Sequence, residues 1–221
     1  MKKKCPNCDL VNFPTARGCS RCGAALMRID YEIAERPGKS GILRRAIICL
    51  IVSMIAVAGF YVSLVFSAKG LTNEERKTVA SAIDILENRG FTDEAFILRR
   101  IAVFRGNDNW LNASVAKETA FAATNFPFEI VTIYPDFFSY PADNVERAAI
   151  LLHEAKHLAG ADEKGAYEFV WGNREKLGWT HDKYADSTVW IEIRKQTRDY
   201  VPALFVCDVN TFSDCTEVRK Y

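Results

Sequence analysis

An uncharged apolar run from Ala46 to Ala68 constrains this chain more than any other feature. About 20 apolar residues are enough to cross the hydrocarbon core of a bilayer as a helix, and the run has that length. A secretory signal peptide would lie at the very start of the chain and would have a shorter apolar core. A buried helix of a soluble protein rarely lacks charges for so long. The run therefore predicts one transmembrane helix at 46–68, in a chain that crosses the membrane once.

The basic residues around this run predict its orientation. Those before it include Lys2, Lys3, Lys4, Arg28, Arg36, Lys39, Arg44 and Arg45. The basic residues that follow it are interleaved with Glu74 and Glu75. Basic residues favour the cytoplasmic side, so we expect a cytoplasmic N-terminus, a linker at 28–45 and an extracytoplasmic domain at 69–221. The net charge of +1 gives no reason to expect a nucleic acid as partner.

Four of the seven cysteines form two C-x-x-C pairs near the N-terminus, Cys5 with Cys8 and Cys19 with Cys22. Four thiolates at this spacing can surround one zinc ion, which then supplies the folding energy that so short a segment lacks. All four positions are taken, which indicates a structural site rather than a catalytic one. The alternative is a redox dithiol pair. The arrangement resembles the short zinc ribbons at the N-terminus of many bacterial membrane proteins, which implies a zinc ribbon at 1–27.

The other cysteines favour different environments. Cys207 and Cys215 lie close enough in sequence to close a small loop, and a disulfide between them suits an oxidising exterior. The four N-terminal cysteines suit the reducing cytosol instead. Cys49 needs no role beyond that of a small apolar residue in the span. Cysteine usage thus agrees with the orientation predicted from charge.

The segment His153-Glu154-Ala155-Lys156-His157 carries two of the three histidines of the chain. We expect it on a helix from Asn144 to about Ala159, with Asp143 as N-cap. Residues four apart share a helix face, so both imidazoles can reach one zinc ion, and Glu154 can take a proton from a zinc-bound water. The approach to His153 is strongly apolar, which makes unpaired polar groups there costly. The alternative is an ordinary surface pair of histidines.

A catalytic zinc site needs a third protein ligand and an open position. Glu163, which follows a turn at Gly160, is the best candidate, with Glu168 and Asp162 as fallbacks. H-E-x-x-H-x-x-G-x-x-E resembles the long metzincin motif with Glu163 in place of its last histidine. Glu163-Lys-Gly-Ala-Tyr167 resembles the E-x-x-A-D signature of gluzincins, with Tyr167 in place of the Asp. We favour the gluzincin-like resemblance because the ligand is a carboxylate.

This resemblance implies a zinc peptidase in which Glu154 acts as general base. The tetrahedral oxyanion then needs a second donor, for which His181 is a candidate, with Tyr184 and Tyr167 as others. Glu129–Tyr134, an alternating β-branched segment, is the candidate edge strand that aligns an extended substrate, as in zincins generally. Asp162 is a candidate to orient a zinc-bound histidine in place of the missing Asp.

Further helices are expected from Thr72 to about Asn88 behind a capping box, from Thr92 to about Phe104, from Asp162 to Lys176 and from Asp182 to Asp199. Phe169, Trp171, Trp179 and Trp190 are expected in the core. Together these features predict an α+β protein: a mainly helical zincin-like domain with a small sheet, preceded by a transmembrane helix and a four-cysteine zinc ribbon. The predicted function is a membrane-anchored zinc metallopeptidase with one catalytic and one structural zinc ion and a peptide or protein substrate. The alternative is a non-enzymatic membrane-anchored protein for assembly or signalling. The sequence does not indicate an oligomeric state.

Overall fold

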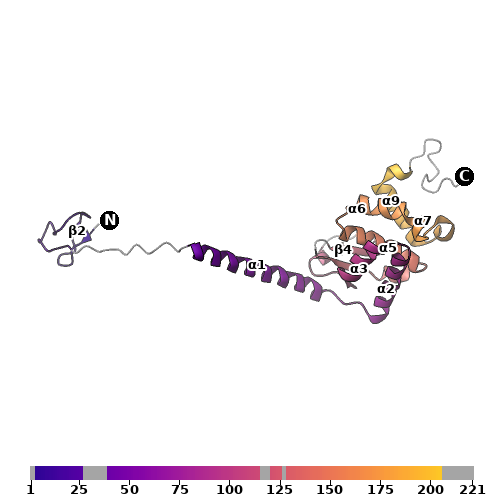
Figure 1. Cartoon of the computed structure of the whole chain (residues 1–221), viewed down its shortest axis with the longest axis horizontal. Helices are drawn as coiled ribbons and strands as arrows, with labels where there is room; N and C mark the ends of the chain where they lie inside the picture. Colours follow the sequence, from indigo (N-terminus) through magenta and orange to yellow (C-terminus); the bar gives the residue numbers. More distant parts are fainter. Residues whose placement is uncertain (1–2, 27–38, 115–119, 126–127, 206–221) are drawn as a thin grey trace. The chain divides into compact units, whose positions relative to one another are not determined.

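The computed structural model describes residues 3–26, 39–114, 120–125 and 128–205 (Figure 1). The chain divides into two compact units, Met1–Ser53 and Met54–Tyr221, and the division falls inside the long apolar helix. The domain boundaries expected from the sequence therefore stay predictions, and each unit is considered by itself below. Cys207 and Cys215 lie outside the described residues, and so does the disulfide predicted between them.

The described residues of the N-terminal unit before α1, residues 3–26, form two similar turns around the cysteines. Strands β1 (Lys3–Lys4) and β2 (Val11–Asn12) pair antiparallel. In each turn the first cysteine donates its backbone N–H to the residue five positions later, at 2.9 Å for Cys5 and 2.8 Å for Cys19. The tight turn requires a positive φ, and Gly23 adopts 70° in the second turn. The first cysteine of each turn, Cys5 or Cys19, is buried, whereas Cys8 is partly buried and Cys22 is exposed.

Helix α1 spans Lys39–Ser67 and contains the apolar run. Among the described residues it is the one helix long and apolar enough to cross a membrane, over Gly41–Ser67. Only 6% of its most apolar window is buried within the chain. A core helix of a soluble protein would hide these side chains against its neighbours, which α1 does not do.

The second unit begins with helices α2 (Asn73–Asn88) and α3 (Thr92–Arg100). The predicted capping box is confirmed, because Thr72 and Glu75 exchange side-chain and backbone hydrogen bonds. The prediction that the next helix reaches Phe104 was wrong. It ends at Arg100, and the N-cap position is Phe91, without a side-chain hydrogen bond. Residues Val103–Arg105 form strand β3 instead, because they pair in parallel with a later strand.

The second unit also contains a three-stranded sheet, with the strands in the order β3-β5-β4. Strand β4 (Ala122–Asn125) is antiparallel to β5 (Ile130–Ile133). All four residues of β5 are buried, as expected for a strand paired on both sides. The prediction that Glu129–Tyr134 forms the edge strand was therefore wrong: this segment contains the central strand, and β4 is the edge nearest the candidate site.

The remaining helices are α4 (Asp136–Ser139), α5 (Asn144–Leu158), α6 (Glu163–Gly172), α7 (Arg174–Leu177), α8 (His181–Tyr184) and α9 (Thr188–Tyr200), with short 3-10 turns at Asn112–Ser114 and Pro202–Phe205. The predicted helix at 162–176 is divided at Asn173. The predicted helix at 182–199 is divided before Ser187, whose side chain caps α9 through Trp190 N–H.

The core forms where α5 contacts α2, α3, α6 and β4. Helix α5 lies in the middle of this group in Figure 1. Trp171, Trp179 and Trp190 pack edge-to-face or tilted at centroid distances of 4.8–5.8 Å, and Phe169 packs against the same core. The core position predicted for these four aromatic residues is confirmed. The predicted α+β class holds in its coarse form: mostly helices, small sheets, one long apolar helix and a cysteine cluster.

Candidate functional site

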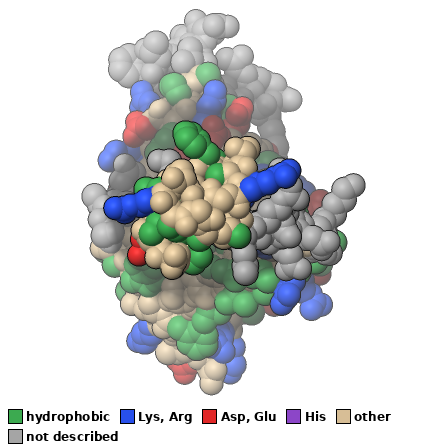
Figure 2. All heavy atoms as spheres, turned by 90° about the vertical axis from the view of Figure 1, so that its left-hand side faces the viewer, with side chains coloured by type: hydrophobic (Ala, Val, Ile, Leu, Met, Phe, Trp, Pro, Cys, Tyr) green, Lys and Arg blue, Asp and Glu red, His purple; other side chains and the backbone are tan. Residues whose placement is uncertain are grey.

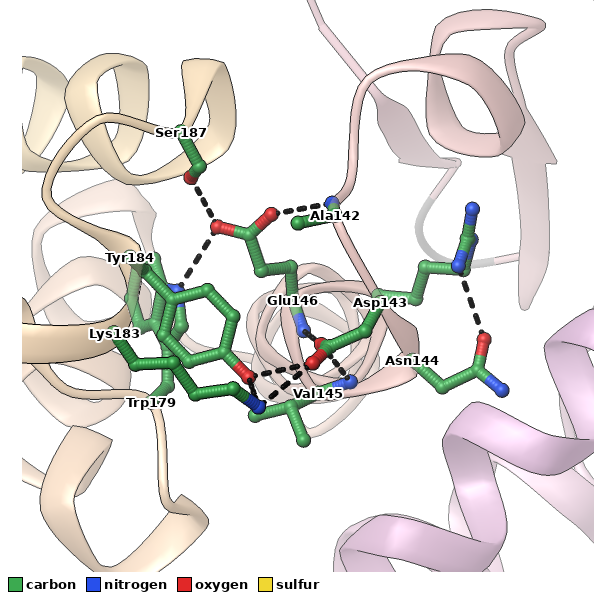
Figure 3. Close-up of polar contacts among 10 residues, drawn as sticks. Ala142, Asp143, Asn144, Val145, Glu146, Trp179, Lys183, Tyr184 and Ser187 are labelled. Carbon is green, nitrogen blue, oxygen red and sulfur yellow. Dashed lines mark hydrogen bonds and ion pairs between the residues drawn. The ribbon is translucent and has the colours of Figure 1, made fainter.

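The candidate site is built on α5, whose start is fixed by polar contacts with α8 and α9 (Figure 3). Asp143 is the N-cap, as predicted, and accepts from the backbone N–H groups of Val145 and Glu146. Glu146 is fully buried and accepts from Ala142 N–H at 2.7 Å. Its other carboxylate oxygen accepts from the Trp179 indole at 3.3 Å and from the Ser187 hydroxyl. This buried carboxylate therefore ties the first turn of α5 to three other segments.

A second set of contacts continues from Asp143. Its Oδ2 accepts from Lys183 Nζ at 2.9 Å and from the Tyr184 hydroxyl at 2.8 Å, as the dashed lines of Figure 3 show. Partial burial raises the pKa of Asp143, but the bonds from Lys183, Tyr184 and the helix N–H groups outweigh it, so the net pKa is lowered. Asp143 therefore stays ionised as a cap, and α5 has a fixed starting point.

At the other end of α5, the structure brings His153, His157 and Glu163 together. The two Nε2 atoms lie 3.0 Å apart. The Glu163 oxygens lie 3.3 Å from His153 Nε2 and 3.4 Å from His157 Nε2. A tetrahedral ion bonded at about 2.0–2.1 Å separates its ligand atoms by about 3.3 Å. The three side chains thus have the spacing of three ligands around one metal ion, and Gly160, with φ 89°, makes the turn that returns Glu163 to the histidines.

The electrostatics of these three groups favour a positive charge between them. His157 Nδ1 lies 2.9 Å from the Ala161 carbonyl, which can only accept, so Nδ1 carries a proton and Nε2 is the atom that can bind a metal ion. Burial lowers the pKa of His157, but the Glu163 carboxylate and the Ala161 carbonyl raise it to about 9. The two imidazoles hold the pKa of Glu163 well below its ordinary range. The three groups thus attract positive charge, which either a proton on Nε2 or a metal ion in its place can supply.

Tyr167 orients His153 by packing rather than by a hydrogen bond. Its ring lies 4.3 Å from the imidazole, centroid to centroid, and stacks on Tyr200 at 5.2 Å. Its hydroxyl donates to Gln196 Oε1 at 2.7 Å. His153 Nδ1 is buried and has no hydrogen-bond partner among the described residues. An aromatic ring therefore occupies the place where the gluzincin signature has an acid.

Glu154 lies beside the two imidazoles and is 4% exposed. Its Oε2 accepts from the hydroxyl of Thr124, on the edge strand β4, at 2.7 Å. Both residues face a cavity of about 570 Å³ that also contains His153, His157 and Glu163. This volume lies in the ordinary range for ligand-binding cavities. The cavity is thus bordered by α5 on one side and by the edge strand on the other.

Sequence reasoning did not identify Thr124, or Tyr134 and Asp108 as part of this cavity. The Tyr134 hydroxyl donates to Asp108 Oδ1 at 2.7 Å, and both residues line the cavity. Burial, and then the negative charge of Glu154, raise the pKa of Tyr134, so it remains a phenol with a proton to donate. No local pattern marks these residues, because Thr124 lies on β4, Tyr134 follows β5 and Asp108 follows β3, and only the folded sheet brings them together.

Other predicted site residues lie elsewhere. His181 is about half exposed at the start of α8, near Asp182 and the Trp190 ring, and does not line the cavity. The structure therefore does not bring it to the candidate site, because α8 contacts α5 at its opposite end, near Asp143, and its catalytic role stays a prediction. Tyr184 is bonded to Asp143, as described above. Asp162 caps α6 through Gly165 N–H at 2.8 Å, and Glu168 is exposed on α6 outside the cavity, so neither fallback ligand is placed to bind.

The four N-terminal cysteines form a second cluster that could hold a metal ion. Their sulfur atoms lie 3.6 Å apart for Cys5 and Cys22 and 3.5 Å apart for Cys8 and Cys19, too far for disulfides. At a metal–sulfur distance of about 2.3 Å, tetrahedral ligands lie about 3.8 Å apart, close to these values. Backbone N–H groups of Arg21 and Cys22 lower the pKa of Cys19 to about 6, which favours the thiolate that binds metals.

In Figure 2 the N-terminal unit faces the viewer, and the Lys and Arg side chains seen on it lie apart at its sides. No continuous basic patch covers the described residues on this face.

No family model, curated protein or solved structure matches this chain. Its function is therefore argued from its own residues.

Proposed function

We propose that this chain is a membrane-anchored zinc-dependent peptidase with a gluzincin-like site. The observation that carries the proposal is the convergence of His153, His157 and Glu163 on one point, with Glu154 beside them in a cavity bordered by an edge strand. Three ligands leave a tetrahedral ion one open position, which is the arrangement of catalytic rather than structural zinc. The imidazole and carboxylate donors suit zinc.

The residues have separate tasks in this proposal. Bound zinc would supply an acidic water and polarise the scissile carbonyl. Glu154 would accept the proton of that water, and Thr124 would hold the carboxylate in place. Tyr134 is the best candidate to donate a hydrogen bond to the developing oxyanion, in place of His181, once its hydroxyl turns from Asp108 to the substrate. The edge strand β4 would align the substrate backbone, in place of β5.

The cysteine cluster would hold a second zinc ion with a structural task. We further propose that the N-terminus is cytoplasmic and that residues 69–221 lie outside the cytoplasm, because the basic residues precede α1. Protease treatment of intact cells should then remove epitopes placed after α1 and spare those placed before it. Protection of the C-terminal epitope would contradict this orientation.

The decisive experiment measures metal content and hydrolysis together on the full chain in detergent. The wild type should contain two zinc ions per chain and cut members of a mixed peptide library. The double variant His153→Ala/His157→Ala should contain one ion and be inactive. Glu154→Gln should keep both ions but lose hydrolysis by a factor of 10² or more, since it lacks the base. Glu168→Gln, an exposed glutamate on α6, is the matched control and should behave as wild type.

Two outcomes would overturn the proposal. If Glu154→Gln hydrolyses peptides at the wild-type rate, the activity belongs to another site or to a contaminant. If the wild type binds two ions and cuts no peptide, the chain is a non-enzymatic zinc protein. A role in assembly or signalling is then the better explanation for residues 69–221.

A further inference from the structure

The last turns of α1 are attached to the domain that follows them. Leu64 is fully buried, whereas Phe66 is 82% exposed. The Ser63 hydroxyl accepts from the indole N–H of Trp110 at 3.3 Å. The Ser67 hydroxyl accepts from the backbone N–H of the same tryptophan at 3.2 Å. One face of the apolar helix is therefore covered by protein at this end.

Aromatic and backbone contacts strengthen this attachment. The Phe60 ring meets Trp110 edge-on at 5.8 Å and lies 5.4 Å from Phe128. Gly106 N–H donates to the carbonyl of Lys69 at 2.8 Å. The segment from Gly106 to Asn112, called the juxtamembrane loop below, thus contacts α1 along about two turns.

The juxtamembrane loop contacts α1 at residues that lie before the end of the apolar run. Lys69 is the first charged residue after this run. At a rise of about 1.5 Å per residue, Ser63 precedes it by about 9 Å and Phe60 by about 13 Å along the helix axis. Trp110 contacts both, so its ring lies at the depth of the headgroup and upper acyl region if α1 spans the bilayer. Tryptophan is enriched at that depth because its ring is apolar and its N–H is polar.

The same loop forms part of the cavity. Asp108 and Asn112 line the cavity that contains His153 and Glu154, while Trp110 and Leu111 between them are 51% and 37% exposed. A lipid surface is the occupant that fits these exposed side chains, because they continue the apolar surface of the membrane helix to which the loop is attached.

We propose that Trp110, Leu111 and Phe66 lie in the lipid interface at the end of α1, and that the juxtamembrane loop holds the cavity close to the bilayer. The substrates are then membrane-anchored polypeptides cut within a few residues of the point where they leave the membrane. The statement about substrates rests on the peptidase activity proposed above, whereas the statement about lipid contact does not.

Lipid contact can be measured without any activity. Three of the four tryptophans, Trp171, Trp179 and Trp190, are at most 2% exposed, so lipid-borne quenchers should reach Trp110 selectively. The full chain is placed in phosphatidylcholine vesicles that carry a doxyl group at a shallow or a deep acyl position. The shallow label should quench a larger fraction of the wild-type tryptophan fluorescence than the deep label does. Neither label should quench the fluorescence of Trp110→Phe. Equal fluorescence with labelled and unlabelled lipid would overturn the proposal, and a cross-linked dimer through this loop would assign the surface to a second copy instead.

The substrate class is tested in the same vesicles. One cleavable sequence is joined to a transmembrane helix either directly or through a flexible spacer of about 30 residues, so that both substrates are equally concentrated in the membrane. The wild type should cut the directly joined substrate at least tenfold faster. Leu111→Glu should lose this preference while cutting the free peptide at the wild-type rate. Equal rates for both anchored substrates would overturn the substrate claim. Quenching of Trp110 without cleavage of any substrate would instead refute the peptidase proposal and leave the lipid contact standing.

Discussion

The buried carboxylate of Glu146 gives the sharpest prediction about stability. Glu146→Ala removes the acceptor of three donors, the Ala142 N–H, the Trp179 indole and the Ser187 hydroxyl. Each buried donor left without a partner costs about 1–3 kcal/mol, and the Ser187 hydroxyl can turn to another acceptor or to water, which offsets part of the total. We therefore expect a net loss of about 3 kcal/mol, which for a chain of this size lowers the midpoint of thermal unfolding by about 6–12 °C.

The assay is thermal unfolding of the full chain in detergent, followed by tryptophan fluorescence, since Trp179 contacts Glu146 directly. Glu146→Gln keeps one carbonyl oxygen as acceptor and should lose roughly half as much. Asp84→Ala, which breaks an exposed ion pair with Arg99, is the control and should cost less than about 1 kcal/mol. If Glu146→Ala unfolds within 2 °C of wild type, or if Glu146→Gln is as unstable as Glu146→Ala, the hydrogen bonds of Figure 3 do not hold α5 as argued.

Four further predictions concern the metal sites and the cap of α5. Glu163→Ala should lower zinc content from two ions to one, measured by elemental analysis after dialysis, because two imidazoles alone hold zinc weakly; an unchanged content would exclude Glu163 as a ligand. Tyr134→Phe should keep both ions but lower kcat by about 10²-fold, the usual cost of one oxyanion donor; an unchanged kcat would assign that donor elsewhere. Cys19→Ser should remove the other ion and unfold the N-terminal unit, visible as loss of its NMR dispersion. Because its folded pKa is lowered, Asp143 adds stability that is present above its unfolded pKa of about 4 and is lost as pH falls through the lower folded value. Asp143→Asn, which can still cap a helix, should weaken that acid dependence in unfolding curves, and an identical curve would refute the assignment.

The parts of the site that are local in sequence could be predicted. Asp143 caps α5 because a short acid before an apolar helical segment satisfies the first N–H groups. His153 and His157 share a face because they are four residues apart on a helix. Glu163 follows them closely, after the turn at Gly160 and the N-cap Asp162. Each of these relations spans only a few residues, so spacing and residue type carry the information.

The parts that depend on the sheet could not be predicted. Strand β5 was predicted within Glu129–Tyr134, but β3 and β4 have only three and four residues, too few for alternation to identify them, and no pattern gives the order of the strands. Thr124 is 30 positions from Glu154, and no pattern in the sequence links them. His181 was chosen because histidines are scarce in this chain, which is a statement about composition and says nothing of position.

The candidate metal ligands are close in sequence, whereas the other residues of the candidate site are brought together by the sheet. All three candidate ligands come from one helix and the turn after it, so the metal site needs only α5, Gly160 and the start of α6. The orientation of Glu154 depends on Thr124, and the shape of the cavity depends on Thr124, Tyr134 and Asp108, which the sheet and the loop after β3 bring to the site. In the proposed peptidase, changes in the sheet should therefore abolish hydrolysis while the metal is retained, because no change limited to the sheet removes one of the candidate ligands. A non-enzymatic zinc protein would then differ from a peptidase at β4 and β5 rather than at the histidines, and these strands are where the two functions are to be distinguished.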